Sequence, residues 1–83
     1  MRVILFGAAW CPSCVTFKPE VESVCAENDV DLKYLDVDEY FDIAGLYAVK
    51  TIPAIVVIDD LEQDTLYSGS CSREELIERL VCE

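Results

Sequence analysis

Two cysteines separated by two residues are the side chains best suited to chemistry in this sequence, in the segment Cys11-Pro12-Ser13-Cys14. This spacing brings both sulfurs within bonding range inside a single helical turn. A disulfide that closes so small a loop adds little stability, so it is better suited to being made and broken during a reaction. The sequence contains no histidine. The usual general base and the commonest metal ligand are therefore absent, and any chemistry must come from Cys, Asp or Glu.

The cysteine pair lies between the apolar run Val3–Phe6 and a helix that opens at Pro12. The N-terminus of a helix presents unpaired N–H groups and about half a positive charge, which together stabilise a thiolate. We therefore expect Cys11 to be the exposed sulfur that attacks first. Cys14 lies one turn further along the apolar stripe of the helix. We expect it to be the shielded sulfur that resolves a mixed disulfide.

Metal binding is the main alternative use of such a pair. A structural zinc ion takes four ligands, commonly from a second Cys-x-x-Cys or a pair of histidines, and the other cysteines, at positions 25, 71 and 82, are isolated. An iron–sulfur cluster shared by two chains is disfavoured because Pro12 would crowd it. The sequence thus predicts neither a metal nor another cofactor. We expect Cys25 to be a small core residue and Cys82 an exposed thiol. For Cys71, packing at a helix start is favoured over an auxiliary redox role.

Seven segments must position the cysteine pair. Apolar and β-branched runs predict strands at residues 3–6, 30–37, 54–58 and 65–67. Helices are expected to begin at Cys11, after a cap at Asp38, and at the capping box of Ser72 and Glu75. Pro19 should kink the first helix. The order β-α-β-α-β-β-α predicts an α/β fold in which a four-stranded mixed sheet is flanked by three helices, within a single domain of residues 1–83.

The second helix is the one expected after the cap at Asp38. Its spacing predicts that four residues point toward the core: Tyr40, Phe41, Ala44 and Tyr47.

Length and charge restrict the possible partners. The chain has 83 residues and a net charge of −11, which disfavours nucleic acid and anionic membrane surfaces. The apolar run Val3–Phe6 is much shorter than a membrane span of about 20 residues. We therefore expect a soluble, unprocessed, cytoplasmic monomer. In a reducing cytoplasm, a Cys-x-x-Cys pair is more often catalytic or metal-binding than structural.

The segment Ala8–Cys14 resembles the active-site region of the thioredoxin family. Lys50–Pro53 is similar to the cis-proline loop of that family, Gly69 to the glycine before its last helix, and Pro19 to the proline that kinks its first helix. The resemblance implies a minimal thioredoxin-like fold, similar to short thioredoxins that lack an N-terminal strand and helix. It also implies a thiol–disulfide oxidoreductase that reduces protein disulfides and receives electrons from a thioredoxin-reductase-type donor.

The same resemblance implies roles for individual residues. Cys11 and Cys14 would be catalytic, Pro53 would be cis, and the backbone of Ile52 would pair with a substrate strand. The implied substrate-binding residues are Trp10, Pro12, Ser13, Thr51, Ile52, Pro53 and Gly69. No acidic residue occurs before Glu20 or between residues 45 and 58. These segments should therefore form an uncharged docking surface on an acidic protein.

Two departures from the thioredoxin pattern affect the chemistry. Proline comes first between the cysteines, as in glutaredoxins, and Leu5 replaces a buried aspartate that thioredoxins carry. We therefore expect no carboxylate to move the proton of Cys14. The alternative function is that of a glutathione-dependent glutaredoxin. It is disfavoured because Trp10 stands where a basic residue would, Gly69 is a single glycine, and the net charge of −11 repels anionic glutathione.

Overall fold

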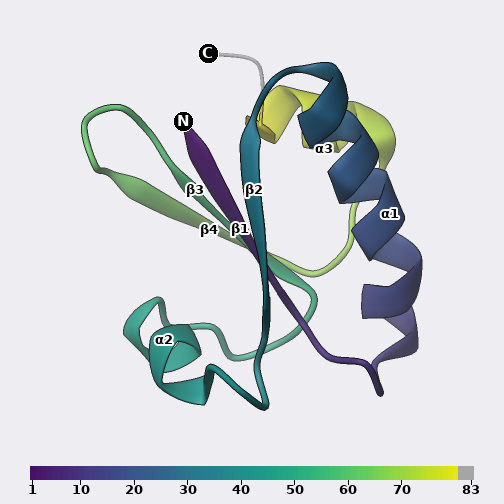
Figure 1. The fold of residues 1–83 in the computed structure, drawn as a ribbon, viewed down its shortest axis with the longest axis vertical. Helices are drawn as coiled ribbons and strands as arrows, with labels where there is room; N and C mark the ends of the chain where they lie inside the picture. The colour runs from purple at the N-terminus through teal and green to yellow at the C-terminus, as the bar shows by residue number, and fades with distance from the viewer. Residues whose placement is uncertain (81–83) are drawn as a thin grey trace.

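The two most apolar segments of the chain form the centre of a sheet. In the computed structural model, which describes residues 1–80, these segments are β1 (Arg2–Gly7) and β3 (Ala54–Ile58), which lie side by side. The outer strands are β2 (Asp31–Asp36) and β4 (Asp64–Ser68), in the order β2-β1-β3-β4. Only β1 and β2 are parallel; the other neighbouring strands are antiparallel (Figure 1). The predicted four-stranded mixed sheet is confirmed.

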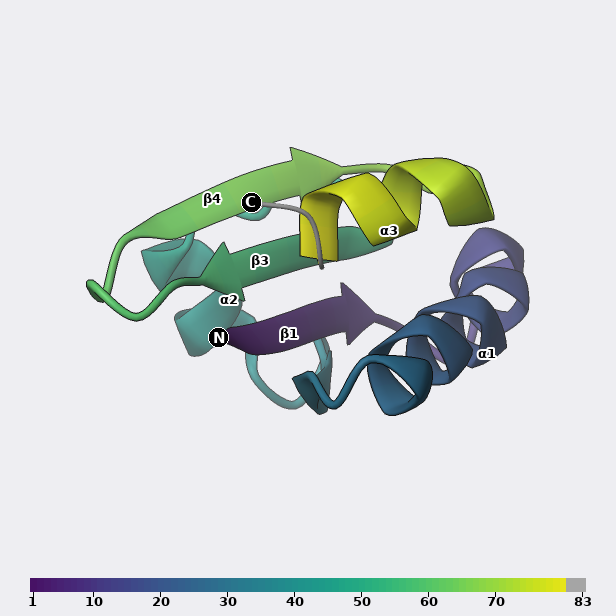
Figure 2. The ribbon, with the colours of Figure 1, turned by 90° about the horizontal axis from the view of Figure 1, so that it is seen from above.

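Helices cover both faces of this sheet. Because side chains alternate along a strand, Val3 and Leu5 of β1 pack on one face and Phe6 on the other. The first face is covered by α1 (Pro12–Glu27) and α3 (Arg73–Leu80), which lie next to each other in Figure 2. The second face is covered at one end by α2 (Phe41–Leu46). The predicted element order and α/β fold class are confirmed.

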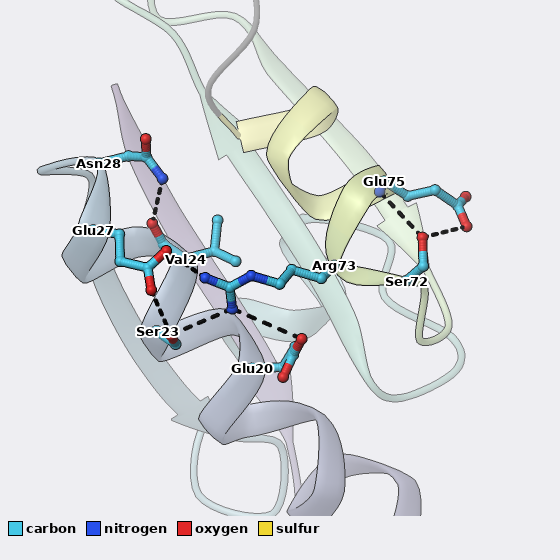
Figure 3. Close-up of polar contacts among 8 residues, drawn as sticks. All are labelled: Glu20, Ser23, Val24, Glu27, Asn28, Ser72, Arg73 and Glu75. Carbon is cyan, nitrogen blue, oxygen red and sulfur yellow. Dashed lines mark hydrogen bonds and ion pairs between the residues drawn. The ribbon is translucent and has the colours of Figure 1, made fainter.

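Polar contacts fix α3 against α1 (Figure 3). One half of the predicted capping box is present, because the Glu75 amide donates to Ser72 Oγ at 3.2 Å. The Glu75 carboxylate accepts from the same hydroxyl at 3.3 Å. Arg73, at the start of α3, reaches across to α1, where its guanidinium pairs with Glu27 and lies 3.8 Å from Glu20. These contacts hold the start of α3 against the second half of α1.

The predicted start of α2 is wrong. Asp38 does not cap the helix, because the chain first makes a tight turn in which the amides of residues 39 and 40 donate to the carbonyl oxygen of Asp36. The helix then begins at Phe41, which is 75% exposed instead of buried, whereas Ala44 is buried as expected.

The other predicted boundaries differ from the observed ones by one residue in most cases. Helix α1 continues through Pro19 to Glu27, and the kink expected at Pro19 stays a prediction. No helix within residues 1–80 has the length and apolar character needed to cross a membrane.

Candidate active site

The chain leaves β1 at Gly7 and enters α1 through a short turn that ends at Cys11. The Cys11 amide donates to the Ala8 carbonyl oxygen at 3.2 Å, and Pro12 occupies the first helical turn, where its missing N–H costs nothing. Cys11 is therefore the N-cap residue, and its Sγ accepts a hydrogen bond of 3.3 Å from the backbone amide of Cys14. The positive end of the helix thus points at the Cys11 sulfur.

Both cysteines are buried, with exposed fractions of 7% for Cys11 and 3% for Cys14. The expectation that Cys11 would be exposed is wrong. The reason is that Ala8, Val37 and Ile52 pack around the pair and leave only an edge of Cys11 open.

The thiol of Cys14 holds its proton tightly. Burial, followed by the hydrogen bond to Cys11, raises the pKa of Cys14 from 9.0 to about 11. The negative charges of Cys11 and Asp36 act in the same direction. Cys14 is thus protonated at neutral pH, and it can attack a disulfide only after it has lost that proton.

The proline loop lies against the cysteine pair. The Ile52–Pro53 peptide bond is cis, which confirms the expectation from the resemblance, and Ile52 packs on the cysteines. The amide of Gly69 donates to the Pro53 carbonyl oxygen at 2.8 Å. Gly69 has φ +84°, a value that side chains disfavour, and this explains a glycine at this position. Three separate segments therefore meet at the site.

The remaining predicted substrate-binding residues surround this meeting point. Pro12, Ser13 and Thr51 are exposed, and Trp10 is 66% exposed. The indole nitrogen of Trp10 donates to the Asp38 carboxylate at 2.7 Å, which fixes the ring beside the cysteines.

Two grooves flank the cysteine pair. One, of about 530 Å³, lies between the starts of α1 and α3 and is lined by Pro12, Cys71 and Arg73 among others. The other, of about 290 Å³, lies on the α2 side, and its lining includes Trp10 and Ile52.

Sequence comparison agrees with this geometry. A family model described as Thioredoxin matches residues 1–81. The chain belongs to the thioredoxin family. It is 33% identical over 82 residues to a thioredoxin of Staphylococcus epidermidis, and the match covers 96% of this chain and 79% of that protein. As a family member, the chain is a thiol–disulfide oxidoreductase whose substrates are protein disulfides.

Solved thioredoxin structures support the same assignment. A mutant thioredoxin from Halobacterium salinarum is 29% identical with a TM-score of 0.88, and the match covers 95% of this chain and 70% of the other. Fasciola hepatica thioredoxin is 32% identical with a TM-score of 0.83, and the match covers 94% of this chain and 75% of the other. The thioredoxin-like fold expected from the resemblance is confirmed.

The other cysteines lie outside the thioredoxin motif. Cys25 is 2% exposed within the core under α1, as predicted. Cys71 is half-buried near the start of α3, where burial raises its pKa. Cys82 lies outside the described residues. Within residues 1–80, no three Cys, Asp or Glu side chains are grouped closely enough to hold a metal ion.

Sequence reasoning missed two residues near the thioredoxin motif, Tyr34 and Asp36. They are two positions apart on β2 and so face the same side of the sheet, the side that α1 covers. The negative charge of Asp36 raises the pKa of Cys14. The expectation that no carboxylate moves the proton of Cys14 considered only Leu5 of β1, whereas Asp36 of β2 lies near enough for its charge to act on that thiol. The alternation of Leu32, Tyr34 and Asp36 in the sequence was the signal that could have identified them.

Proposed function

We propose that this thioredoxin-family chain reduces protein disulfides with Cys11 as the nucleophile and Cys14 as the resolving thiol. The observation that supports this assignment most strongly is the asymmetry of the pair. The Cys11 sulfur accepts a hydrogen bond from the first turn of α1, whereas Cys14 is held protonated with a pKa of about 11. A hydrogen bond from a helix amide, as at Cys11, favours an attacking thiolate, whereas a thiol that holds its proton, as at Cys14, does not attack first.

The reaction proceeds in two steps. The Cys11 thiolate attacks one sulfur of the substrate disulfide, so that a mixed disulfide forms and the other substrate sulfur leaves as a thiolate that takes a proton from water. The sulfur of Cys14 then loses its proton and attacks Cys11 Sγ. The bond to the substrate breaks, the second substrate thiol is released, and a Cys11–Cys14 disulfide remains. Two electrons have passed from the pair to the substrate.

The surface around the pair suits an extended, uncharged segment of a protein. Ile52 lies against the cysteines, and its backbone is the group expected to pair with a substrate strand. On the α2 side, the exposed rings of Trp10 and Phe41 line the smaller groove and offer apolar contact. The residues proposed to bind substrate are Trp10, Pro12, Ser13, Thr51, Ile52, Pro53 and Gly69.

A thioredoxin-reductase-type enzyme is the proposed electron donor, and the chain would work as a cytoplasmic monomer in electron transport. The net charge of −11 opposes the binding of anionic glutathione. We expect a reduction potential between about −220 and −270 mV, a range that suits a reductant of protein disulfides. Comparing the rates of reduction by such a reductase and by glutathione tests the choice of donor.

Three variants test the roles of the cysteines in turnover of a protein disulfide with dithiothreitol. Cys11→Ser should abolish turnover and form no mixed disulfide. Cys14→Ser should accumulate a mixed disulfide between Cys11 and the substrate, visible by mass spectrometry. Cys71→Ser is the matched control and should turn over at the wild-type rate. Retained turnover in Cys11→Ser would overturn the assignment.

A further inference from the structure

Asp36 and Cys14 approach the same point of the sheet from two different elements. Asp36 is the last residue of β2 and pairs in register with Gly7, the last residue of β1. Gly7 continues the face on which Val3 and Leu5 meet α1. A side chain added at Gly7 would lie 3.2 Å from Cys14 Cβ. The absence of a side chain at Gly7 therefore leaves Cys14 next to the end of β2.

Because side chains alternate between the two faces along β2, the Asp36 side chain points toward α1. Tyr34, two residues earlier, packs against the core under α1, and its hydroxyl lies 3.0 Å from the place that a Gly7 Cβ would occupy. Leu35, between them, packs on the opposite face. Asp36 thus faces the first turn of α1, where Cys14 lies. It is half-buried, and its Oδ1 accepts a hydrogen bond of 2.8 Å from the Asp38 amide, which holds the carboxylate in place.

The resolving step requires a base that this geometry can supply. Cys14 is almost completely enclosed, so bulk water has poor access to its proton. The other titratable or charged groups around it are Tyr34 from β2, Cys11 from the start of α1, Lys18 above the Tyr34 ring at 4.2 Å, and Asp38 in the turn. Burial raises the pKa of Tyr34 above 10.0, so the phenol keeps its proton. Cys11 is occupied in the mixed disulfide, Lys18 is cationic, and the Asp38 carboxylate binds Trp10.

We propose that Asp36 accepts the proton of Cys14 as the Cys14 sulfur attacks the mixed disulfide at Cys11. The inference rests on the proposed roles of the two cysteines. The S–H bond of Cys14 breaks, its proton passes to the Asp36 carboxylate, and the sulfur forms its bond to Cys11 Sγ. The bond from Cys11 to the substrate sulfur breaks, and the substrate leaves as a thiolate. Asp36 then returns the proton to this thiolate or to water, which regenerates the carboxylate.

Stopped-flow reaction with dithiobis(nitrobenzoate) separates the two steps. Attack by Cys11 releases a first coloured thiolate at a rate that depends on reagent concentration. Attack by Cys14 releases a second coloured thiolate at a rate that is independent of reagent concentration. The measurements use protein in which Cys71 and Cys82 are serine, so that these thiols add no signal. Asp36→Asn is compared with Asp31→Asn, the same change at the exposed opposite end of the same strand.

In Asp36→Asn, the first phase should keep its wild-type rate and the second should slow by at least about 10²-fold at neutral pH. The second phase should then rise about tenfold per pH unit while Cys14 stays protonated, and approach the wild-type rate as this thiol ionises at alkaline pH. Asp31→Asn should match the parent protein, in which only Cys71 and Cys82 are replaced by serine, in the rates of both phases. In Asp36→Ser, which removes the carboxylate and leaves room for a small anion, added formate should restore part of the second phase.

A second phase in Asp36→Asn that matches the parent at neutral pH would overturn the inference. Slowing of both phases by the same factor at every pH would also overturn it, because it would indicate a structural role. A first phase that keeps its rate in Cys11→Ser would instead contradict the proposed role of Cys11.

Discussion

The first turn of α1 and the whole of α2 stand at the same end of the sheet, on opposite faces, and differ in how tightly they are packed. The turn of α1 begins with a hydrogen bond to the Cys11 sulfur and buries Cys14 and Phe17. Helix α2 has six residues, no side-chain cap and a single buried residue, Ala44. Its Phe41 is 75% exposed. The chemistry is thus located where neighbouring atoms are fixed, and the other side presents apolar surface to solvent.

This difference has a physical reason. A buried thiol needs fixed neighbours, because its pKa changes when neighbouring dipoles or charges move. Its distance from the attacked sulfur also has to be kept. A surface that receives many protein substrates gains from exposed aromatic rings, which bring a large contact area at little cost in conformational entropy. The α1 side therefore sets the reactivity of the pair, and we expect the α2 side to contribute to affinity for the substrate.

The largest predicted effect concerns the stability of the α1 side at alkaline pH. Below the ordinary thiol pKa of 9.0, Cys14 is protonated in the folded and unfolded states, so its contribution to stability is fully present. Between pH 9 and the folded pKa of about 11, only the unfolded thiol ionises, so the free energy of unfolding should fall by about 2 kcal/mol at most. Chemical denaturation of the reduced protein measures this loss. Cys14→Ser, which does not ionise, should lose clearly less, and an equal loss would contradict the proposed enclosure of Cys14.

The next effect compares glycines on the two sides. Gly7→Ala should lower the free energy of unfolding by about 1 kcal/mol, because the new methyl group would lie 3.0 Å from the Tyr34 hydroxyl and 3.2 Å from Cys14 Cβ. In α2, Gly45→Ala meets no atom within 4 Å and should stabilise the protein by about 0.5 kcal/mol. Thermal or urea denaturation measures both changes. Equal effects of the same sign would remove the contrast in packing.

The smallest effect concerns substrate affinity on the α2 side. Phe41→Ala should raise KM for a protein disulfide by about threefold to tenfold and leave the melting temperature unchanged, because the ring is already exposed. Leu61→Ala is the control: this side chain is 78% exposed but lies in the turn between β3 and β4. If Phe41→Ala and Leu61→Ala give the same KM, the α2 side does not bind substrate.

The sequence was sufficient to predict the fold because its strongest patterns are local. The continuous apolar run of β3, the capping box at Ser72 and the cysteine pair before a helix each specify an element without reference to the rest of the chain. The order of these elements then leaves few possible topologies. The prediction that the peptide bond before Pro53 is cis rests on the family resemblance and not on any local pattern.

The errors arose where distant segments meet. Cys11 is buried because Ile52 and Val37 pack on it from other parts of the chain, which helix position alone does not show. Phe41 fits a helical core stripe, yet the turn at Asp36 delays the start of α2 and leaves the ring outside. The sequence alone does not place Asp36 near Cys14, because its neighbour across the sheet, Gly7, is known only from the register of β1 and β2.

The most direct test of the contrast between the two cysteines is the order in which they are alkylated. Reduced native protein is treated with a limiting amount of iodoacetamide at neutral pH, and the labelled positions are read by peptide mass spectrometry. Cys11, whose sulfur accepts the helix amide, should be labelled well before Cys14, which is held protonated with a pKa of about 11. Labelling of Cys14 before Cys11 would contradict the assignment of nucleophile and resolving thiol.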